Sequence, residues 1–195
     1  MEQTSSSKSV QVSFQQAPEE ALEYITDLAH RIWPHTFGEI LSPQQLTYML
    51  DWMYAPAHLA AQAAEGHRFY LVYTSGEEVP IGFFGIQHAL SPPEELRDLP
   101  AGATATKIHK AYLLPERQGT GIGRSLFTFI QELALQAGSA AVFLNVNKYN
   151  VSAIRFYERI GFTRIREEVI DIGAGYVMDD YVYAQSLRSR PLAKT

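Results

Sequence analysis

A glycine-rich segment at residues 118–123, Gln-Gly-Thr-Gly-Ile-Gly, constrains the fold of this chain more than any other stretch. The apolar run before it ends at Leu114 and is typical of a strand. After it, apolar residues recur every three or four positions over residues 122–137, which predicts an amphipathic helix. A strand-to-helix turn of this kind directs several backbone N–H groups at one point, beside the positive end of the helix dipole. Glycine lets an anion approach the backbone closely. The segment therefore predicts a phosphate-binding loop.

The spacing of the glycines excludes two common phosphate loops and favours a third. A dinucleotide-binding fingerprint that starts at Gly119 needs glycine or alanine at position 124, and a Walker A loop needs Gly-Lys-Ser/Thr at positions 124–126. The chain has Arg-Ser-Leu there. The pattern that fits is Gln/Arg-x-x-Gly-x-Gly/Ala, met by Gln118, Gly121 and Gly123. It resembles the pyrophosphate loop of the GNAT superfamily of N-acetyltransferases, which bind acetyl-CoA.

A second segment, residues 150–162, resembles the same superfamily. It contains Asn150, Ala153, Phe156, Tyr157 and a closing Gly-Phe in the pattern Asn-x-x-Ala-x-x-Phe-Tyr-x-x-x-Gly-Phe, after a strand expected at residues 140–146. With both motifs in matching order and spacing, the resemblance covers about residues 68 to 185. It implies an α/β (α+β) fold: a mixed, mostly antiparallel central sheet of about seven strands, flanked by helices on both faces.

The remaining sequence predicts one domain. A chain of 195 residues with 46% hydrophobic content can bury a full core. We expect a disordered tail at residues 1–9, a single domain over 10–185 and a basic tail over 186–195. A helix is expected over residues 21–33, ended by Pro34. The exposed pattern of Val177, Tyr181 and Tyr183 suggests strand pairing with a second copy, giving a homodimer.

Composition excludes several kinds of partner. The net charge is −5 and no basic stripe occurs, so we expect no nucleic-acid partner. No apolar run approaches the ~20 residues that a membrane span needs, and the first residues lack a signal-peptide core. We therefore expect a cytoplasmic protein that does not engage membranes. The chain has no cysteine, which excludes disulfides and thiolate ligands, and we expect no metal.

The resemblance implies transfer of acetyl from acetyl-CoA to a primary amine, and it assigns the cofactor site residue by residue. The N–H groups of the glycine loop hold the pyrophosphate, and the strand before the loop pairs with the pantetheine arm. Asn150 contacts this arm and also caps its helix. The cofactor residues implied are Ala111, Tyr112, Leu113, Gln118, Gly119, Thr120, Gly121, Ile122, Gly123, Arg124 and Asn150.

The same resemblance makes Tyr157 the general acid that protonates the CoA thiolate. Because the chain has no cysteine, direct transfer in a ternary complex is expected. Many relatives carry glutamates where this chain, counted back from Gln118 without gaps, has Lys107 and His109. Strand alternation puts both on the side of Leu113, and His109, which ordinarily titrates near neutrality, is the expected base.

The acceptor pocket is expected from the segment after residue 33 and from the last hairpin. Its candidates are Trp33, His35, Tyr48, Trp52 and Tyr176. A small-molecule amine is the favoured acceptor, with a polyamine as one candidate, because residues 33–54 and 179–183 share a faint similarity with spermine/spermidine acetyltransferases. Glu39 and Asp51 would then pair with a second positive charge.

Two other functions remain open. One is acetylation of a protein N-terminus or lysine; against it, relatives that acetylate ribosomal-protein N-termini carry a catalytic glutamate where this chain has Asn145. The other is an acetyl-CoA-binding sensor without catalysis.

Overall fold

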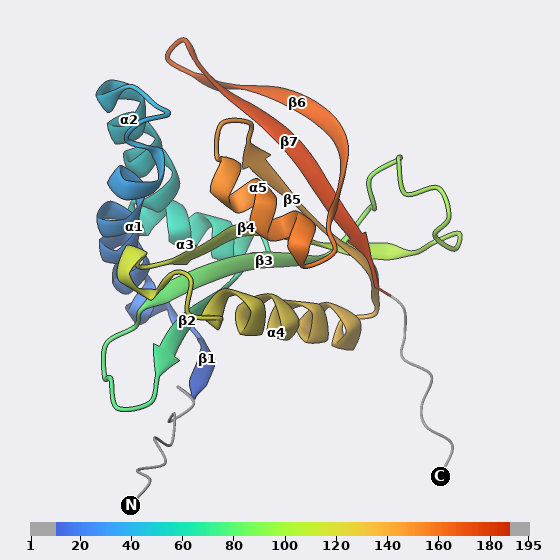
Figure 1. The fold of residues 1–195 in the computed structure, drawn as a ribbon, viewed down its shortest axis with the longest axis horizontal. Helices are drawn as coiled ribbons and strands as arrows, with labels where there is room; N and C mark the ends of the chain where they lie inside the picture. The colour runs from blue at the N-terminus through green and yellow to red at the C-terminus, as the bar shows by residue number, and fades with distance from the viewer. Residues whose placement is uncertain (1–10, 188–195) are drawn as a thin grey trace, which may run out of the picture.

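The fold is built on one mixed sheet of seven strands, seen in a computed structural model that describes residues 11–187 (Figure 1). The expected tails at 1–9 and, apart from Ser186 and Leu187, at 186–195 lie outside the described residues. The strands are β1 Val12–Gln16, β2 Arg68–Thr74, β3 Gly82–Leu90, β4 Thr104–Leu113, β5 Ser139–Asn147, β6 Thr163–Gly173 and β7 Tyr176–Ser186. The expected fold class is confirmed.

The strands lie in the order β1-β2-β3-β4-β5-β7-β6. All neighbours are antiparallel except β4 and β5, which are parallel and joined by the crossover helix α4 (Ile122–Gln136). A parallel pair needs such a crossover. The glycine loop lies at the start of this crossover, as the sequence predicted.

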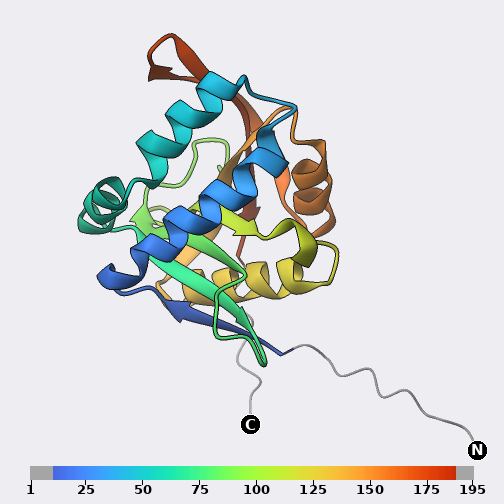
Figure 2. The same ribbon diagram turned by 90° about the vertical axis from the view of Figure 1, so that its left-hand side faces the viewer.

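Helices cover both faces of the sheet. Phe83 and Phe84 are successive residues of β3, so their side chains point to opposite faces. Phe83 packs on Tyr54 of α2 (Pro43–Tyr54), with ring centroids 5.8 Å apart, and Phe84 packs on Phe129 of α4, 6.2 Å apart. In Figure 2, α2 and its neighbour α1 (Leu22–Phe37) face the viewer, with α4 below them. The short helices α3 (Pro56–Ala64) and α5 (Val151–Arg159) complete the two layers.

Pro34 does not end the first helix, contrary to the sequence prediction. Helix α1 continues to Phe37, and the carbonyl of Pro34 accepts a hydrogen bond from the N–H of Gly38. A proline so near the C-terminal end costs one intrahelical hydrogen bond. Trp33 and Phe37 pack against each other and against Tyr112. These contacts outweigh the lost bond, so the helix keeps its last turn.

Tyr183 is not exposed, contrary to the pattern on which the homodimer was expected. Its side chain is only 2% exposed, and its hydroxyl donates to Glu158 of α5. Val177 does lie on the surface. The homodimer stays a prediction that rests on fewer exposed residues than the sequence suggested.

None of the helices between residues 11 and 187 has the length and apolar character that crossing a membrane requires.

Candidate active site

The site lies where β4 and β5 cease to pair. Their parallel ladder ends at Ile108 and Leu144. Beyond this point β4 stays paired with β3 as far as Leu113, and β5 stays paired with β7 as far as Asn147. The two strands therefore separate while each keeps its outer neighbour, and the backbone edges between them are left open. Such an edge can pair with an extended, amide-bearing ligand.

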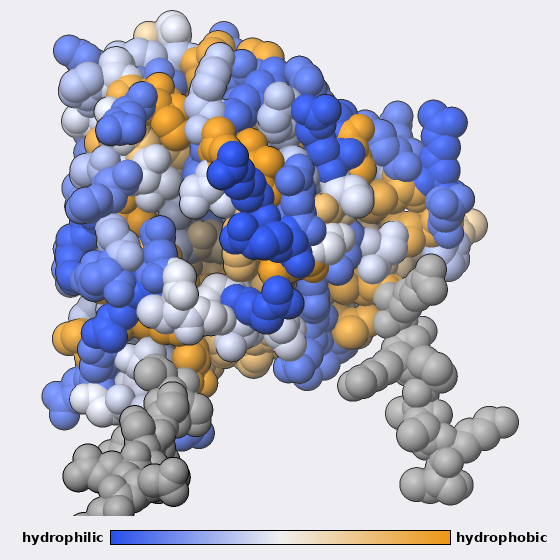
Figure 3. Space-filling model, in the orientation of Figure 1, coloured by the Kyte–Doolittle hydropathy of each residue, from blue (hydrophilic) through white to orange (hydrophobic). Residues whose placement is uncertain are grey.

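A cavity of about 820 Å³ occupies this opening. Figure 3 shows the face recessed near its middle, with hydrophobic side chains in the recess. Thirteen of the residues selected from the sequence line the cavity: Trp33, His35, His109, Ala111, Tyr112, Leu113, Gln118, Gly119, Gly121, Gly123, Arg124, Asn150 and Tyr157. The other five do not: Tyr48, Trp52, Thr120, Ile122 and Tyr176.

The glycine loop has free backbone N–H groups, and its three glycines line the cavity. Gly119 and Gly121 have φ of 74° and 89°, in the left-handed region that favours glycine. Within the described part of the chain, the N–H groups of residues 119–123 find no acceptor. The N–H of Arg124, in contrast, donates to the carbonyl of Gly121. Five N–H groups at the start of α4 are thus available to an anion. The N–H of Arg124, which the sequence also assigned to the phosphate site, is not.

Thr120 and Ile122 serve the loop rather than the cavity. The Thr120 hydroxyl donates to the carbonyl of Arg117 at 2.7 Å, which closes the turn. Ile122, the first residue of α4, is buried in the core. Gln118 links the loop to the strand, because its side-chain amide donates to the carbonyl of Leu113 at 3.2 Å.

Helix α5 is capped at its start and packs closely against the start of α4. The side chain of Asn150 accepts a hydrogen bond from the N–H of Ala153 at 3.2 Å, which confirms the expected N-cap. A Cβ added at Gly123 would lie 3.3 Å from the ring of Phe156. Glycine therefore allows α4 and α5 to approach closely. This contact sets the position of the next residue, Tyr157.

Tyr157 lines the cavity and packs against other aromatic rings. Its ring lies 5.4 Å from that of Phe127 and 6.0 Å from that of Phe162. Burial raises the pKa of Tyr157 to about 12. The hydroxyl therefore stays protonated at neutral pH. It is therefore able to donate a proton to a group in the cavity.

His109 lies at a β-bulge, which overturns the alternation expected from the sequence. Gly85 pairs with Lys110 and Ile86 pairs with Ile108, so His109 is the extra residue and has no partner on β3. A bulge reverses the alternation of side chains beyond it. His109 and Leu113 therefore do not share a face.

The environment of His109 also removes the reason for expecting it to be the base. Its ring stacks on His67 at 4.0 Å and its Nε2 lies 3.1 Å from Oε1 of Gln87. Burial, with the nearby charges of His67, Lys107 and Lys110, lowers the pKa of His109 to about 2. The neutral imidazole is thus a very weak base.

The cavity wall on the side of α1, α2 and α3 carries cations. Lys110 is only 5% exposed, and its Nζ donates to Oε1 of Gln62 at 2.7 Å and lies 5.4 Å from the ring centroid of Tyr54. Burial lowers the pKa of Lys110 to about 8. Lys107 also lines the cavity. Trp33 completes this wall, and its buried indole N–H has no partner among the described residues.

Three of the expected acceptor aromatics form a group outside the cavity. Tyr48 lies 6.3 Å from Trp52 and 5.3 Å from Tyr176, measured between ring centroids. The Tyr48 hydroxyl donates to the carbonyl of Ile172 at 2.5 Å. Since Ile172 and Tyr176 belong to the last hairpin, this group joins α2 to the β6–β7 hairpin. The sequence alone could not distinguish this role from ligand contact.

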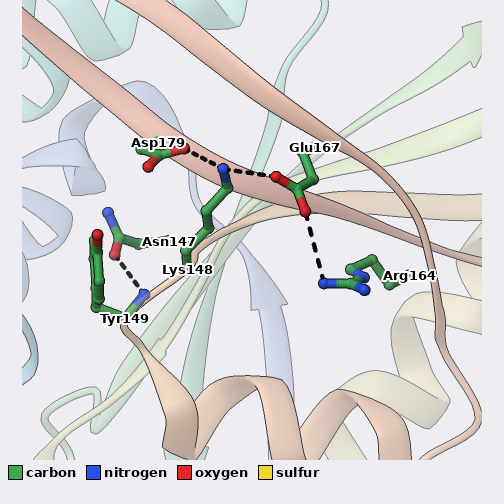
Figure 4. A network of polar contacts seen from close by, with 6 residues as sticks. All are labelled: Asn147, Lys148, Tyr149, Arg164, Glu167 and Asp179. Carbon is green, nitrogen blue, oxygen red and sulfur yellow. Dashed lines mark hydrogen bonds and ion pairs between the residues drawn. The ribbon is translucent and has the colours of Figure 1, made fainter.

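Asp180 is one of the cavity residues that sequence reasoning missed. It lies on β7, is 6% exposed and lines the cavity together with Asn145. In the sequence it is one of two adjacent aspartates. Which of the two faces the cavity cannot be told until the two faces of the strand are known. The neighbouring Asp179 forms an ion pair of 2.6 Å with Lys148, which also pairs with Glu167 of β6 (Figure 4). Lys148 thereby joins the end of β5 to the hairpin that carries Asp180.

Comparison with known proteins matches this chain to one family. Residues 22–162 match the model of the acetyltransferase (GNAT) family. The chain is 28% identical over 167 residues to an uncharacterized N-acetyltransferase of Lactobacillus delbrueckii subsp. lactis, which covers 85% of this chain and 90% of that protein.

Two further similarities concern a named relative and a solved structure. The chain is 31% identical over 111 residues to the N-alpha-acetyltransferase RimI of Mycobacterium tuberculosis, which covers 56% of this chain and 61% of RimI. The fold resembles the crystal structure of the PaiA N-acetyltransferase of Thermoplasma acidophilum in complex with coenzyme A. The TM-score is 0.68 at 18% identity, covering 91% of this chain and 99% of that one.

Proposed function

Because this chain belongs to the acetyltransferase (GNAT) family and takes its acetyl group from acetyl-CoA, we propose that it acetylates the primary amine of a small molecule by direct transfer in a ternary complex. The observation that carries the proposal is the opening between β4 and β5. There Gly119, Gly121 and Gly123 of the glycine loop, the unpaired edge of β4 and Tyr157 line a single cavity.

Each part of the cavity has a proposed role in binding the donor. The N–H groups of the glycine loop bind the pyrophosphate, with the side chain of Arg124 adding charge. The edge of β4 at residues 111–113 pairs with the pantetheine amides, and its N–H near Leu113 polarises the thioester carbonyl. One such donor contributes about 3 kcal/mol in the transition state. Asn150 lines the same part of the cavity.

Tyr157 is the proposed general acid. Its phenol protonates the CoA thiolate as it leaves, so that the thiol and not the thiolate is released. The absence of cysteine from the sequence supports attack by the amine on the thioester itself.

The acceptor half of the cavity supports a small molecule. It lies beneath α1 and α2, where Trp33 and Met49 line it and are themselves buried. A polyamine finds no support in the charges. Glu39 and Asp51, which were to pair with a second ammonium, are exposed and do not line the cavity, whereas Lys107 and Lys110 do.

A protein N-terminus is the second candidate acceptor. The observation that favours it is the similarity to RimI, which is named as an N-alpha-acetyltransferase. Asn145 is the residue that argues against this second candidate, because relatives that acetylate ribosomal-protein N-termini carry a catalytic glutamate at its position. The side-chain amide of Asn145 donates a hydrogen bond to Glu168 at 2.7 Å.

Release of free thiol from acetyl-CoA tests the proposal. The acceptor panel contains monoamines, amino acids, aminoglycosides, diamines, spermidine and N-terminal peptides. Saturable turnover with a small amine is expected. Turnover with peptides alone would favour the second candidate. No turnover with any acceptor, with CoA still bound, would favour a catalytically silent sensor.

A further inference from the structure

Asp180 lies at the open edge of the sheet. It is the residue of β7 opposite Asn147, the last rung of the ladder between β5 and β7. At this pair of residues β5 has already separated from β4. A side chain of β7 on the face of the sheet that carries the cavity can therefore reach the cavity. Asp180 is 6% exposed and lines it, as do Asn145 and Lys107.

The carboxylate of Asp180 has no protein partner. Within residues 11–187 it forms no ion pair at 4 Å or less, and no side-chain hydrogen bond reaches it. Lys148, which contacts this hairpin, is occupied by Asp179 and Glu167. A buried anion without a partner is costly to the fold, so a group left in this state beside a cavity is a candidate for a ligand contact.

The charges that face Asp180 come from four elements of the structure. Burial raises its pKa, and the negative charges of Glu168 on β6 and Asp179 on β7 add to this effect. Lys107 on β4 and Lys148 after β5 act in the opposite direction, and the result is a pKa of about 6. The group is thus a carboxylate at neutral pH and a stronger base than an ordinary aspartate.

Asp180 and Tyr157 line the same cavity, and both act electrostatically on Tyr112. Burial raises the pKa of Tyr112, and after burial the largest cause is Tyr157, with Asp180 also contributing. Both groups therefore lie within electrostatic range of Tyr112. This residue belongs to the open edge of β4 on which the thioester is expected to lie.

We propose that Asp180 binds the ammonium group of the acceptor and accepts its proton, which makes Asp180 the general base and Tyr157 the general acid. This assignment rests on the proposed function. The ammonium proton passes to the carboxylate, and the freed lone pair forms the C–N bond to the thioester carbonyl. The C–S bond breaks, and the thiolate takes the phenolic proton of Tyr157. The amide nitrogen loses its second proton, which restores Tyr157, and the proton on Asp180 passes to solvent.

The test is the pH profile of kcat/KM for Asp180→Asn beside Asp179→Asn. Asp179 is the matched control, because it is an adjacent carboxylate already neutralised by Lys148. In the wild type we expect kcat/KM to fall as pH drops below about 6, because the base becomes protonated. For Asp180→Asn, kcat/KM is expected to be about 100-fold lower at pH 7.5, and the fall of kcat/KM below about pH 6 (the acid limb) is expected to be absent. Its residual rate should follow the free amine fraction of the acceptor. Asp179→Asn should stay within about threefold and keep the limb.

Two more variants keep the test decisive. Asp180→Glu retains a carboxylate and is expected to keep the acid limb at a reduced rate. His109→Gln is expected to keep it as well. If Asp180→Asn retains the limb and the rate, or if His109→Gln abolishes the limb, the assignment is overturned.

Failure of the assignment is distinguishable from failure of the proposed function. If Asp180→Asn is active and Tyr157→Phe is inactive, Asp180 is not the general base, while the proposed acetyltransferase function still holds. A wild-type protein that binds CoA and acetylates no amine would overturn the proposed function itself.

Discussion

Asp179 and Asp180 are neighbours on β7, yet their carboxylates lie in opposite environments. The side chain of Asp179 is 34% exposed and lies 2.6 Å from Nζ of Lys148. Asp180 is 6% exposed, and no cation of the described residues lies within ion-pair distance. Successive residues of a strand face opposite sides of the sheet. One strand thus holds a neutralised carboxylate beside one that is available to a ligand.

Asp180→Asn is expected to stabilise the fold while it reduces activity. The folded-state pKa of about 6 lies above the ordinary 3.8, so the folded state binds the proton more tightly and stability falls as pH rises through this interval. Above it, the charged form costs about 3 kcal/mol. Urea unfolding at pH 8 should show a gain on the order of 1–3 kcal/mol, which disappears near pH 4. A loss of stability at pH 8 would contradict the account of Asp180 as an unpaired buried anion.

The pair formed by His67 and His109 should give the opposite dependence on pH. Burial, as the largest cause, lowers their pKa values from 6.5 to about 4 and about 2. Below pH 6.5 the unfolded chain takes up protons that the folded chain refuses, so stability falls as pH falls. His109→Gln should flatten the loss of unfolding free energy between pH 6.5 and 4. His58→Gln, at an exposed site on α3, is the control and should leave the slope unchanged. An equal slope in both variants would count against the buried pair.

The donor half of the site could be predicted from the sequence because its residues are local. The loop at residues 118–123 and the cap at Asn150 depend on glycine conformations and on one side chain at a helix start, and both patterns are read within a few positions. The structure has positive φ at Gly119 and Gly121 and the expected Asn150 bond.

The acceptor half could not be predicted because it depends on contacts between distant segments. The bulge at His109 changes which side chains share a face, and strand alternation does not reveal a bulge. The role of Tyr48 as a link to Ile172 joins residues 124 positions apart. Asp180 differs from Asp179 only through the pairing of β7 with β5. The extension of α1 past Pro34 likewise depends on packing against Tyr112.

Tyr157→Phe should reduce kcat about 100-fold without weakening CoA binding. The loss is expected near the lower end of the usual range for a general acid, because a phenol with a pKa of about 12 is a weaker acid than a free phenol. The phenyl ring keeps the packing against Phe127 and Phe162. Stopped-flow thiol release would give kcat, and calorimetry would give the affinity for CoA. Tyr149→Phe, at a highly exposed tyrosine, is the control. Full activity of Tyr157→Phe would exclude Tyr157 as the acid.

Acceptors with one amine should be preferred over diamines of similar length. A second ammonium in the cavity would face Lys107 and the buried Lys110, and like charges in a poorly solvated site repel strongly. We expect kcat/KM for a monoamine to exceed that for its diamine analogue at least tenfold. Lys107→Met should reduce this ratio, because it removes one cation from the cavity wall. A diamine or spermidine that reacts faster than the matched monoamine would contradict the charge argument.

Gly121→Ala should weaken acetyl-CoA binding beyond what its effect on folding explains. Gly121 has a φ of 89° and nothing within 4 Å of an added Cβ, so alanine there introduces backbone strain without a clash, about 1–2 kcal/mol. Gly102, in the loop before β4, has a φ of 77° and equally open surroundings. Gly102→Ala therefore reproduces the strain away from the cavity. Both variants should lose similar unfolding free energy, but only Gly121→Ala should raise KM for acetyl-CoA, by tenfold or more, because its N–H groups no longer converge on the pyrophosphate. An equal KM in the two variants would show that the loop does not hold the cofactor.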